Sequence, residues 1–272
     1  MDLGRLKKTS SGIVYSCYHS LARDGEHFVP QHTLSYQIAG SLILHDGLRE
    51  YPSDIGSFRL IRRNQLLKFI KRPPEHGDFK SISIYLNQDM LKDFSIENKL
   101  EAKPAEKEKE RAVAEISKSK GLEAYIQSLI AYAEDGSLED EELVKVKIKE
   151  GILLLLQANP ELKDILFDFT EPHKIDLEAY MNQNYHFNVK IDRFAYLTGR
   201  SLATFKRDFE KVFHSSPRRW LLLKRLQQAH YLITVGGKKS SEIYLDLGFE
   251  DISHFSHAFK KVYGHSPSTL LQ

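Results

Sequence analysis

Short apolar runs separated by turn signals dominate the first 86 residues. Each run is rich in β-branched and aromatic residues, which suit the pleated surface of a strand. The turns between them contain Asp-Gly, Pro-Pro and Gly-Asp pairs, which interrupt regular structure. The runs occupy residues 13–18, 32–47, 56–64, 66–72 and 79–86. This pattern predicts a small antiparallel sandwich or barrel.

The pattern changes after Asp89. The stretch Glu101–Gly121 is dense in charge and poor in large apolar residues, which predicts a solvated linker or an exposed loop. Helical periodicity then predicts helices over Leu122–Glu134, Glu139–Gln157 and Pro160–Asp168. The segment ILLLLQ, residues 152–157, is apolar on too many sides for a lone surface helix. It is either core or a subunit interface, and the sequence leaves both open.

The last hundred residues contain an internal repeat. The segments FKRDFEKVFHSSP, residues 205–217, and FSHAFKKVYGHSP, residues 255–267, superpose at an offset of 50 residues. Upstream, FAYLTG at 194–199 matches IYLDLG at 243–248 with one residue slipped. Each copy therefore reads as a short helix, a turn with glycine and a second helix with an aromatic stripe. This arrangement, present twice, predicts a tandem helix-turn-helix.

The second helix of each copy is predicted to have one buried and one polar face. The predicted buried positions are Phe205, Phe209, Val212, Phe213, Leu247, Phe249, Phe255, Phe259, Val262 and Tyr263. Between the copies, Pro217 suits the first position of a connecting helix. Its expected apolar side holds Leu222, Leu223, Leu226, Ala229 and Ile233. Its other side holds Arg218, Lys224, Arg225 and Gln228, whose basic members could reach phosphates.

The formal net charge of +2 hides an asymmetry along the chain. From Lys174 to Gln272 there are 15 Lys and Arg against 9 Asp and Glu, whereas the remainder has 24 against 28. A basic C-terminal part beside an acidic remainder predicts a polyanionic partner for the basic part.

The sequence also indicates the cellular compartment in which the protein is expected. A single cysteine, Cys17, excludes an intramolecular disulfide framework and is expected to pack as a small hydrophobe. The first residues carry no apolar signal region, and the longest aliphatic run, 152–156, is far shorter than the roughly 20 residues that a membrane helix needs. We therefore expect a cytoplasmic protein with no membrane partner.

The repeat, the LGF triplet before its second aromatic helix and the long connecting helix together resemble the DNA-binding domain of the AraC/XylS family of bacterial transcription regulators. The resemblance covers roughly residues 176–271. It implies that two recognition helices enter successive segments of the major groove of double-stranded DNA. Carried over by position, the implied base contacts are Ala203, Thr204, Lys206, Arg207, Ser253, His254 and His257. The implied phosphate contacts are Ser201, Arg218, Arg219, Lys260 and Lys261.

The first half is similar to the family only in the order of its elements, a cupin-like sensor sheet followed by helices that dimerise. The expected class is α+β: a β-rich cupin-like sandwich or barrel with helices, then an all-α tandem helix-turn-helix domain. The expected parts are a sensor at 1–100, a charged linker and dimerisation segment at 101–172, and the DNA-binding domain at 173–272.

The resemblance implies a sequence-specific transcription regulator and not an enzyme. It would be an activator controlled through its N-terminal domain, a homodimer through its N-terminal half, with an unknown effector and RNA polymerase as a possible partner. The alternative is a non-specific nucleic-acid-binding or architectural protein.

No cofactor or metal is expected, because His27 and His32 are too isolated for a cupin metal centre, which needs a His-x-His cluster with a following acid. The same lack of clustered ligands argues against a cupin-type enzyme. The basic side chains of residues 59–72 either reach solvent, the simpler expectation, or line a pocket for an anionic ligand.

Overall fold

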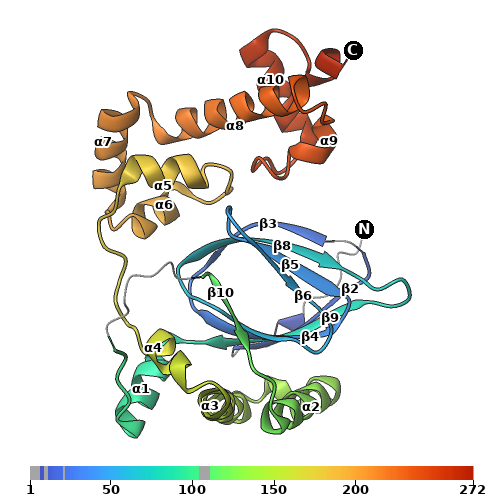
Figure 1. The fold of residues 1–272 in the computed structure, drawn as a ribbon, viewed down its shortest axis with the longest axis vertical. Helices are drawn as coiled ribbons and strands as arrows, with labels where there is room; N and C mark the ends of the chain where they lie inside the picture. The colour runs from blue at the N-terminus through green and yellow to red at the C-terminus, as the bar shows by residue number, and fades with distance from the viewer. Residues whose placement is uncertain (1–6, 9–11, 21, 104–110, 272) are drawn as a thin grey trace. The chain divides into compact units, whose positions relative to one another are not determined.

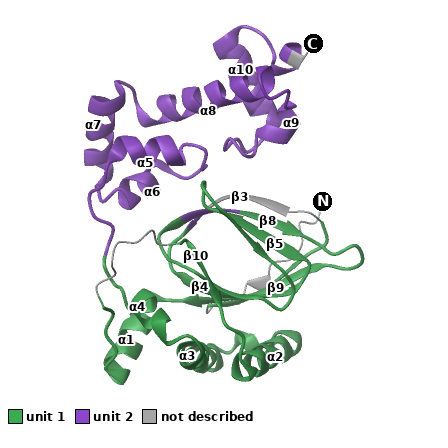
Figure 2. Cartoon of the chain, viewed as in Figure 1, with its two compact units in different colours: residues 1–23, 29–65, 69–170 green, residues 24–28, 66–68, 171–272 purple. Residues whose placement is uncertain are grey.

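Two units make up the chain in a computed structural model that describes residues 7–8, 12–20, 22–103 and 111–271, with only the backbone described at 7–8, 22–27 and 271. Unit 1 comprises residues 1–23, 29–65 and 69–170, and unit 2 comprises 24–28, 66–68 and 171–272. Figure 2 distinguishes them by colour. Unit 1 carries most of the β-structure together with helices, and the helix-turn-helix repeat lies in unit 2, which also includes residues 24–28 and 66–68 of two strands. The expected α+β class is therefore confirmed.

The strands of the described chain form two antiparallel sheets (Figure 1). Sheet A has the order β1-β2-β9-β4-β7-β10 and sheet B the order β3-β8-β5-β6. Their bounds are β1 Lys7–Lys8, β2 Ile13–Tyr18, β3 Ala22–Val29, β4 His32–Ala39, β5 Ser41–His45, β6 Glu50–Ser53, β7 Phe58–Ile61, β8 Gln65–Arg72, β9 Phe79–Leu86 and β10 Val113–Ile116. The predicted antiparallel sandwich or barrel is thus observed.

Several elements of unit 1 were not predicted, among them the short strand β6, strand β10 and helix α1. Strand β10 lies inside the charged stretch that we expected to be a linker or loop, and Val113 and Ile116 pair with Ile61 and Phe58 of β7. Helix α1, Gln88–Asn98, follows β9 directly, and the side chain of Asn87 caps it by accepting a hydrogen bond from the Asp89 amide. Residues 104–110 of the charged stretch lie outside the described residues.

Helices α2 (Lys120–Asp135) and α3 (Glu141–Ala158) lie against one face of sheet A (Figure 1). Their buried residues share a core with Leu34, Leu60 and Ile84 of that sheet. The ILLLLQ segment divides accordingly: Ile152 and Leu155 are buried, whereas Leu153 is 46% exposed. After a 3-10 turn at Pro160–Leu162, helix α4 (Lys163–Leu166) follows.

Unit 2 contains only helices between residues 171 and 271. They are α5 Leu177–Asn184, α6 Ile191–Leu197, α7 Leu202–Phe213, α8 Pro217–Thr234, α9 Ser240–Ile243, α10 Ile252–Tyr263 and the 3-10 helix η3 Pro267–Leu271. One core surrounds Phe205 and Phe209, and a second surrounds Phe255 and Phe259. The connecting helix α8 contributes to both, with Leu221 in the first and Leu226 in the second.

Several burial predictions need correction. Val212 and Val262, expected in the buried stripes, are 41% and 42% exposed, and Leu223 of α8 is also exposed. In the basic segment of unit 1, Arg59 and Arg63 are buried and do not reach solvent. The Arg63 guanidinium donates to the carbonyl oxygens of Asp168 and Thr170, at 3.1 and 2.6 Å.

The described residues give two further findings. None of the helices they form is long and apolar enough to cross a membrane. They also contain no group of three or more His, Cys, Asp or Glu side chains placed to hold a metal ion. His32 is buried, and burial together with the charge of Arg63 lowers its pKa to about 3, whereas the side chain of His27 lies outside the described residues.

Candidate nucleic-acid interface

Helix α7 exposes one polar face and buries the other. Its N-cap is Ser201, whose hydroxyl accepts a hydrogen bond from the Thr204 amide at 3.2 Å. Phe205 and Phe209 are fully buried, with ring centroids 5.5 Å apart, and hold the helix against the first core of unit 2. Ala203, Lys206 and Arg207 are exposed on the other side, and Thr204 is half-buried.

The turn before α7 is fixed by backbone shape and by a buried arginine. Gly199 has φ +64, and a Cβ at this position would collide with the backbone of His173. The neighbouring Arg200 donates to the carbonyl oxygens of Ile175 and Thr198, and its Nε lies 3.2 Å from Oδ2 of Asp208 on α7. These contacts join the turn to the helix that follows it.

The carboxylate of Asp208 lies near three positively charged side chains: Lys174 before α5, Arg200 before α7 and Arg207 on α7. Besides Arg200, its carboxylate lies 3.6 Å from Nζ of Lys174 and 3.8 Å from Nε of Arg207. The hydrogen bond from Arg200, followed by the charges of Lys174 and Arg207, lowers the pKa of Asp208. Arg207 keeps two thirds of its side chain exposed at this distance. The carboxylate of Asp208 therefore orients the Arg207 side chain, which remains available to a partner.

Helix α10 repeats this design. Its N-cap is Asp251, whose carboxylate accepts from the His254 amide at 2.6 Å. Phe255, Ala258 and Phe259 are buried, and the helix ends at Gly264, which has φ +82. The predicted site residues Ser253, His254, His257, Lys260 and Lys261 are all exposed. The predicted polar arc of the second copy therefore forms one continuous helix surface.

Exposed apolar residues follow the same repeat. Leu202 and Ile252, the first residues of α7 and α10, are each 41% exposed. Val212 and Val262, near the two C-terminal ends, are exposed to nearly the same extent. Their positions differ by 50 residues in both pairs, so the offset in the sequence could have identified them. Both helices therefore combine polar, basic and apolar groups on the face away from the core.

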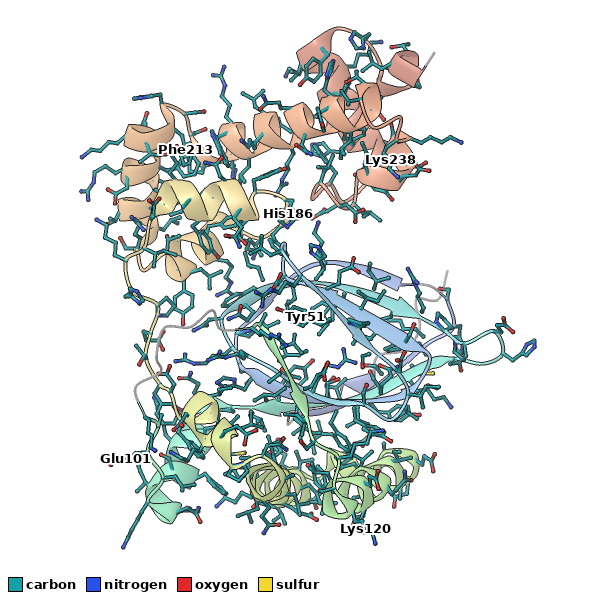
Figure 3. The ribbon with its side chains drawn as sticks, in the orientation of Figure 1. Tyr51, Glu101, Lys120, His186, Phe213 and Lys238 are labelled. Carbon is teal, nitrogen blue, oxygen red and sulfur yellow. The ribbon has the colours of Figure 1, made fainter. Side chains whose placement is uncertain are left out.

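Arg225 of α8 joins the two copies. Its Nε donates to the carbonyl oxygen of Tyr185 at 2.8 Å and its Nη2 to that of Phe187 at 2.8 Å. Its Nη1 donates to the carbonyl oxygen of Gly248, in the second copy, at 3.0 Å. Figure 3 labels His186, which belongs to the loop between α5 and α6 that these bonds hold. The expectation that Arg225 reaches phosphates is therefore corrected.

The contact between the two copies leaves no room for a side chain at position 248. Gly248 has φ +82, and a Cβ there would lie 2.7 Å from the carbonyl oxygen of His186 and 3.0 Å from Cζ of Arg225. Nearby, the Asn188 side chain donates to Glu250 at 2.9 Å. Arg225, Gly248 and the loop 185–188 together form what we call the clasp. It fixes the second copy relative to the first.

The remaining predicted residues lie at helix ends. Arg218 and Arg219, in the first turn of α8, are exposed, as is the N-cap residue Ser201. With Lys260 and Lys261 near the end of α10, they provide positive or hydrogen-bonding groups around the two polar faces. Phosphate oxygens accept hydrogen bonds from such groups.

The chain therefore combines a β-rich unit with a module of two helix-turn-helix copies, and this architecture defines its class. Two family models match the chain. The ExsA N-terminal regulatory domain matches residues 32–169, just over half of it, and a helix-turn-helix domain matches residues 194–272. The chain belongs to the AraC/XylS family of transcription regulators, among those that carry the ExsA N-terminal regulatory domain.

Named relatives are similar over part of their length. Thermoregulatory protein LcrF of Yersinia pestis is 31% identical over 150 residues, covering 54% of this chain and 55% of LcrF. The HTH-type transcriptional regulator ExsA of Pseudomonas aeruginosa is 30% identical over 133 residues, 48% of each chain. The chain spans about half the length of the curated relatives it matches. Among solved structures, a single-residue variant of apo ToxT from Vibrio cholerae aligns over 97% of this chain and 98% of its own, with 14% identity and TM-score 0.42.

Proposed function

We propose that the protein is a sequence-specific transcription regulator that binds double-stranded DNA through α7 and α10. One observation carries the proposal: two helices of matched design expose matched polar faces, and the clasp joins the two copies. A major groove admits one helix, and successive segments of groove on one side of DNA recur every ~34 Å, so a fixed pair of helices suits two such segments.

The roles of the residues follow from their chemistry. Arg207 and Lys206 can donate to guanine O6 and N7, and Thr204 and Ala203 can contact a thymine methyl. Ser253, His254 and His257 occupy the corresponding surface of α10. Leu202 and Ile252 add apolar groups suited to a thymine methyl at the start of each helix.

The phosphate contacts are expected at the edges of the two polar faces. Arg218 and Arg219 begin α8, and Lys260 and Lys261 lie in the last turn of α10. Because such contacts release counterions from DNA, they strengthen binding to every sequence and make it weaken with salt. They position the module and carry no direct sequence information.

The output that we propose is activation of transcription in the bacterial cytoplasm, with RNA polymerase as a partner and unit 1 as the controlling part. A relative from Yersinia enterocolitica with 31% identity is named a virulence regulon transcriptional activator, VirF, which supports activation over repression. We propose that the activity is binding and not catalysis, and the matched regulator families support this.

A homodimer through unit 1 is part of the proposal. Val146 and Leu153 of α3 are 61% and 46% exposed, and residues seven apart lie on the same side of a helix. Large apolar side chains on one stripe of a surface helix are typical of a helix-to-helix interface. The partner is a second copy of α3, since two identical stripes can face each other across a twofold axis.

Selection of bound duplexes from a random pool tests the function. A specific regulator should enrich a single site with two separated conserved segments. Its preference over random DNA should persist as salt rises, although both affinities fall. Equal affinity for the selected and random duplexes at every salt concentration would support the alternative, a non-specific or architectural protein, and would refute specific recognition.

A further inference from the structure

The inner face of sheet A carries a group of polar residues among apolar ones such as Val14, Ile61 and Phe79, whereas the face that packs on α2 and α3 is apolar. Register places Ser83 of β9, Ser35 of β4 and Arg59 of β7 side by side in one row. The next row contains Ser16, Ser81 and Gln37. Of these six residues, all but Ser83 are buried. A purely structural core would place apolar residues here.

This polar face looks toward sheet B. Tyr18 belongs to it, because residues two apart on a strand share a face and Tyr18 follows Ser16 by two on β2. Lys71 of β8, in sheet B, donates to the Tyr18 hydroxyl at 3.0 Å, and its Nζ lies 4.2 Å from the centre of the Tyr18 ring. A second cation therefore reaches the space between the sheets, where Figure 3 shows many side chains.

Arg59 is the least satisfied group on this face. Only 3% of it is exposed, and neither Nη1 nor Nη2 has a hydrogen-bond partner among the described residues. Burial lowers its pKa to about 10, and the carboxylates of Glu115 and Asp54 act in the opposite direction. The guanidinium therefore stays charged at neutral pH. Glu115 of β10 lies opposite Arg59 in the register, but the two buried Nη atoms still lack acceptors within the residues that the structure describes. Buried charged donors without acceptors are strongly unfavourable unless a bound group supplies them.

Within the described ranges, Gln37 has a buried acceptor without a donor, the counterpart of the buried donors of Arg59 that lack acceptors. Its Nε2 donates to the carbonyl oxygens of Ala39 at 2.7 Å and Lys80 at 3.1 Å, which fixes the orientation of the amide. Its Oε1 is buried and receives no donor from the described part of the chain. Gln37 lies two residues from Ser35 along β4, so it is a diagonal neighbour of Arg59, at roughly 7 to 8 Å between backbones.

We infer that the interior of unit 1 binds a small hydroxylated anion, whose carboxylate or phosphate oxygens accept hydrogen bonds from Arg59 and whose hydroxyl donates to Gln37. A planar guanidinium presents parallel donors that match the oxygens of either group. The inference deepens the proposed control through unit 1. It is independent of the DNA-binding residues, so duplex selection can succeed or fail without deciding it.

Thermal unfolding of the full chain with two matched pairs of probes tests the inference. Glycerol 3-phosphate is compared with glycerol, and lactate with lactamide, so that each pair differs mainly in the charge. The anion of at least one pair should raise the Tm of unit 1 by about 2 °C or more at saturation, and its neutral counterpart should not. The pair that responds distinguishes phosphate from carboxylate.

Two variants assign the effect to Arg59. Arg59→Met removes the charge at similar length and should abolish the anion-dependent shift. Arg49→Met removes an exposed arginine of the same unit and should leave the shift intact. If neither anion exceeds its neutral partner, or if Arg59→Met keeps the shift, the inference is wrong.

A measurement on the unmodified protein guards against misfolding of the variant. In the wild-type chain, titration with the stabilising anion should move the side-chain ¹⁵N signals of one buried arginine, with the strongest change in its Nη resonances. Unchanged arginine signals at an anion concentration that raises Tm would place the anion elsewhere and overturn the assignment.

Discussion

Replacing Arg225 with Met should separate the two helix-turn-helix copies without touching either polar face. The guanidinium donates three hydrogen bonds to backbone carbonyl oxygens, two in the loop 185–188 and one at Gly248. Methionine keeps much of the aliphatic stem and none of the donors. The carbonyl oxygens of Phe187 and Gly248, both in buried residues, would then lose this partner.

The expected cost follows from the number and kind of bonds lost. A hydrogen bond to a charged group contributes about 1.5 to 3 kcal/mol. Three bonds from one half-buried guanidinium do not add fully, because water can replace some of them once the clasp opens. We therefore expect the free energy of unfolding of unit 2 to fall by about 2 to 4 kcal/mol. For a part of roughly 100 residues, this lowers Tm by roughly 10 to 20 °C.

The assay needs to resolve the units, since a chain with two units need not unfold in one step. Calorimetry gives the midpoint of each transition, and hydrogen exchange reports the peptides that cover 185–188 and 246–251. Arg218→Met is the matched control, because Arg218 lies on the same helix but is exposed. It should change stability by less than about 0.5 kcal/mol. Arg225→Lys should recover little, because an ammonium cannot span three carbonyl oxygens as a guanidinium does.

DNA binding provides a readout that stability alone does not move. Once a site is selected, one base pair is inserted between its two conserved segments. The wild-type protein should reject the longer site, whereas Arg225→Met should discriminate less between the two lengths. If Arg225→Met unfolds at the same midpoint as Arg218→Met and keeps the wild-type spacing preference, the clasp does not set the geometry and the reasoning fails.

The remaining predictions concern DNA contacts, assembly and pH. Arg207→Ala should weaken the selected site by about 1 to 3 kcal/mol and relax preference at one base position; an equal loss on random DNA would make it a phosphate contact. Lys260→Ala should weaken all sequences alike and reduce the salt slope by about one, and an unchanged slope would remove Lys260 from the interface. Val146→Glu should convert the dimer to monomer in analytical ultracentrifugation, and an unchanged mass would contradict the proposed α3 interface. The lowered pKa of Asp208 means that its stabilising effect is present above the ordinary carboxyl pKa of 3.8 and is lost as pH falls through the lower folded value; Asp208→Asn should therefore flatten the acid side of the Tm profile, and a wild-type profile would refute this role.

The aromatic stripes could be predicted because two signals agreed. Phe205 and Phe209 recur at helical spacing, and the same spacing returns 50 residues later, so chance is a poor explanation. Val212 and Val262 lie at nearly the same wheel angle as Phe205 and Phe255, but the two valines are exposed. A wheel gives the direction of a side chain and not the position of the neighbouring helix. In the last turns of α7 and α10, Phe213 and Tyr263 contact Trp220 and His230 of α8, whereas the valine beside each of them stays exposed.

The errors in unit 1 have a different origin. Strand β10 is only four residues long and is flanked by charge, so its local pattern is too weak to separate it from a loop. Arg59 reads as a surface residue because arginine rarely lies in a core, and only the register with Ser35 reveals its position. Arg225 similarly reads as a free cation, since the sequence does not reveal that three distant carbonyl oxygens converge on it.

If α7 and α10 bind DNA as proposed, their different N-caps would give the module a direction on DNA. The end of α7 is capped by the neutral Ser201, so the partial positive charge of its helix dipole remains available to a phosphate. Asp251 neutralises that charge on α10, whose lysines instead lie at the opposite end. The first copy would therefore contact the DNA backbone at the N-terminal end of α7, and the second copy would contact it at the C-terminal end of α10. A reversed placement would exchange these two unequal sets of contacts, so we expect the helix-turn-helix module to bind a promoter in one orientation.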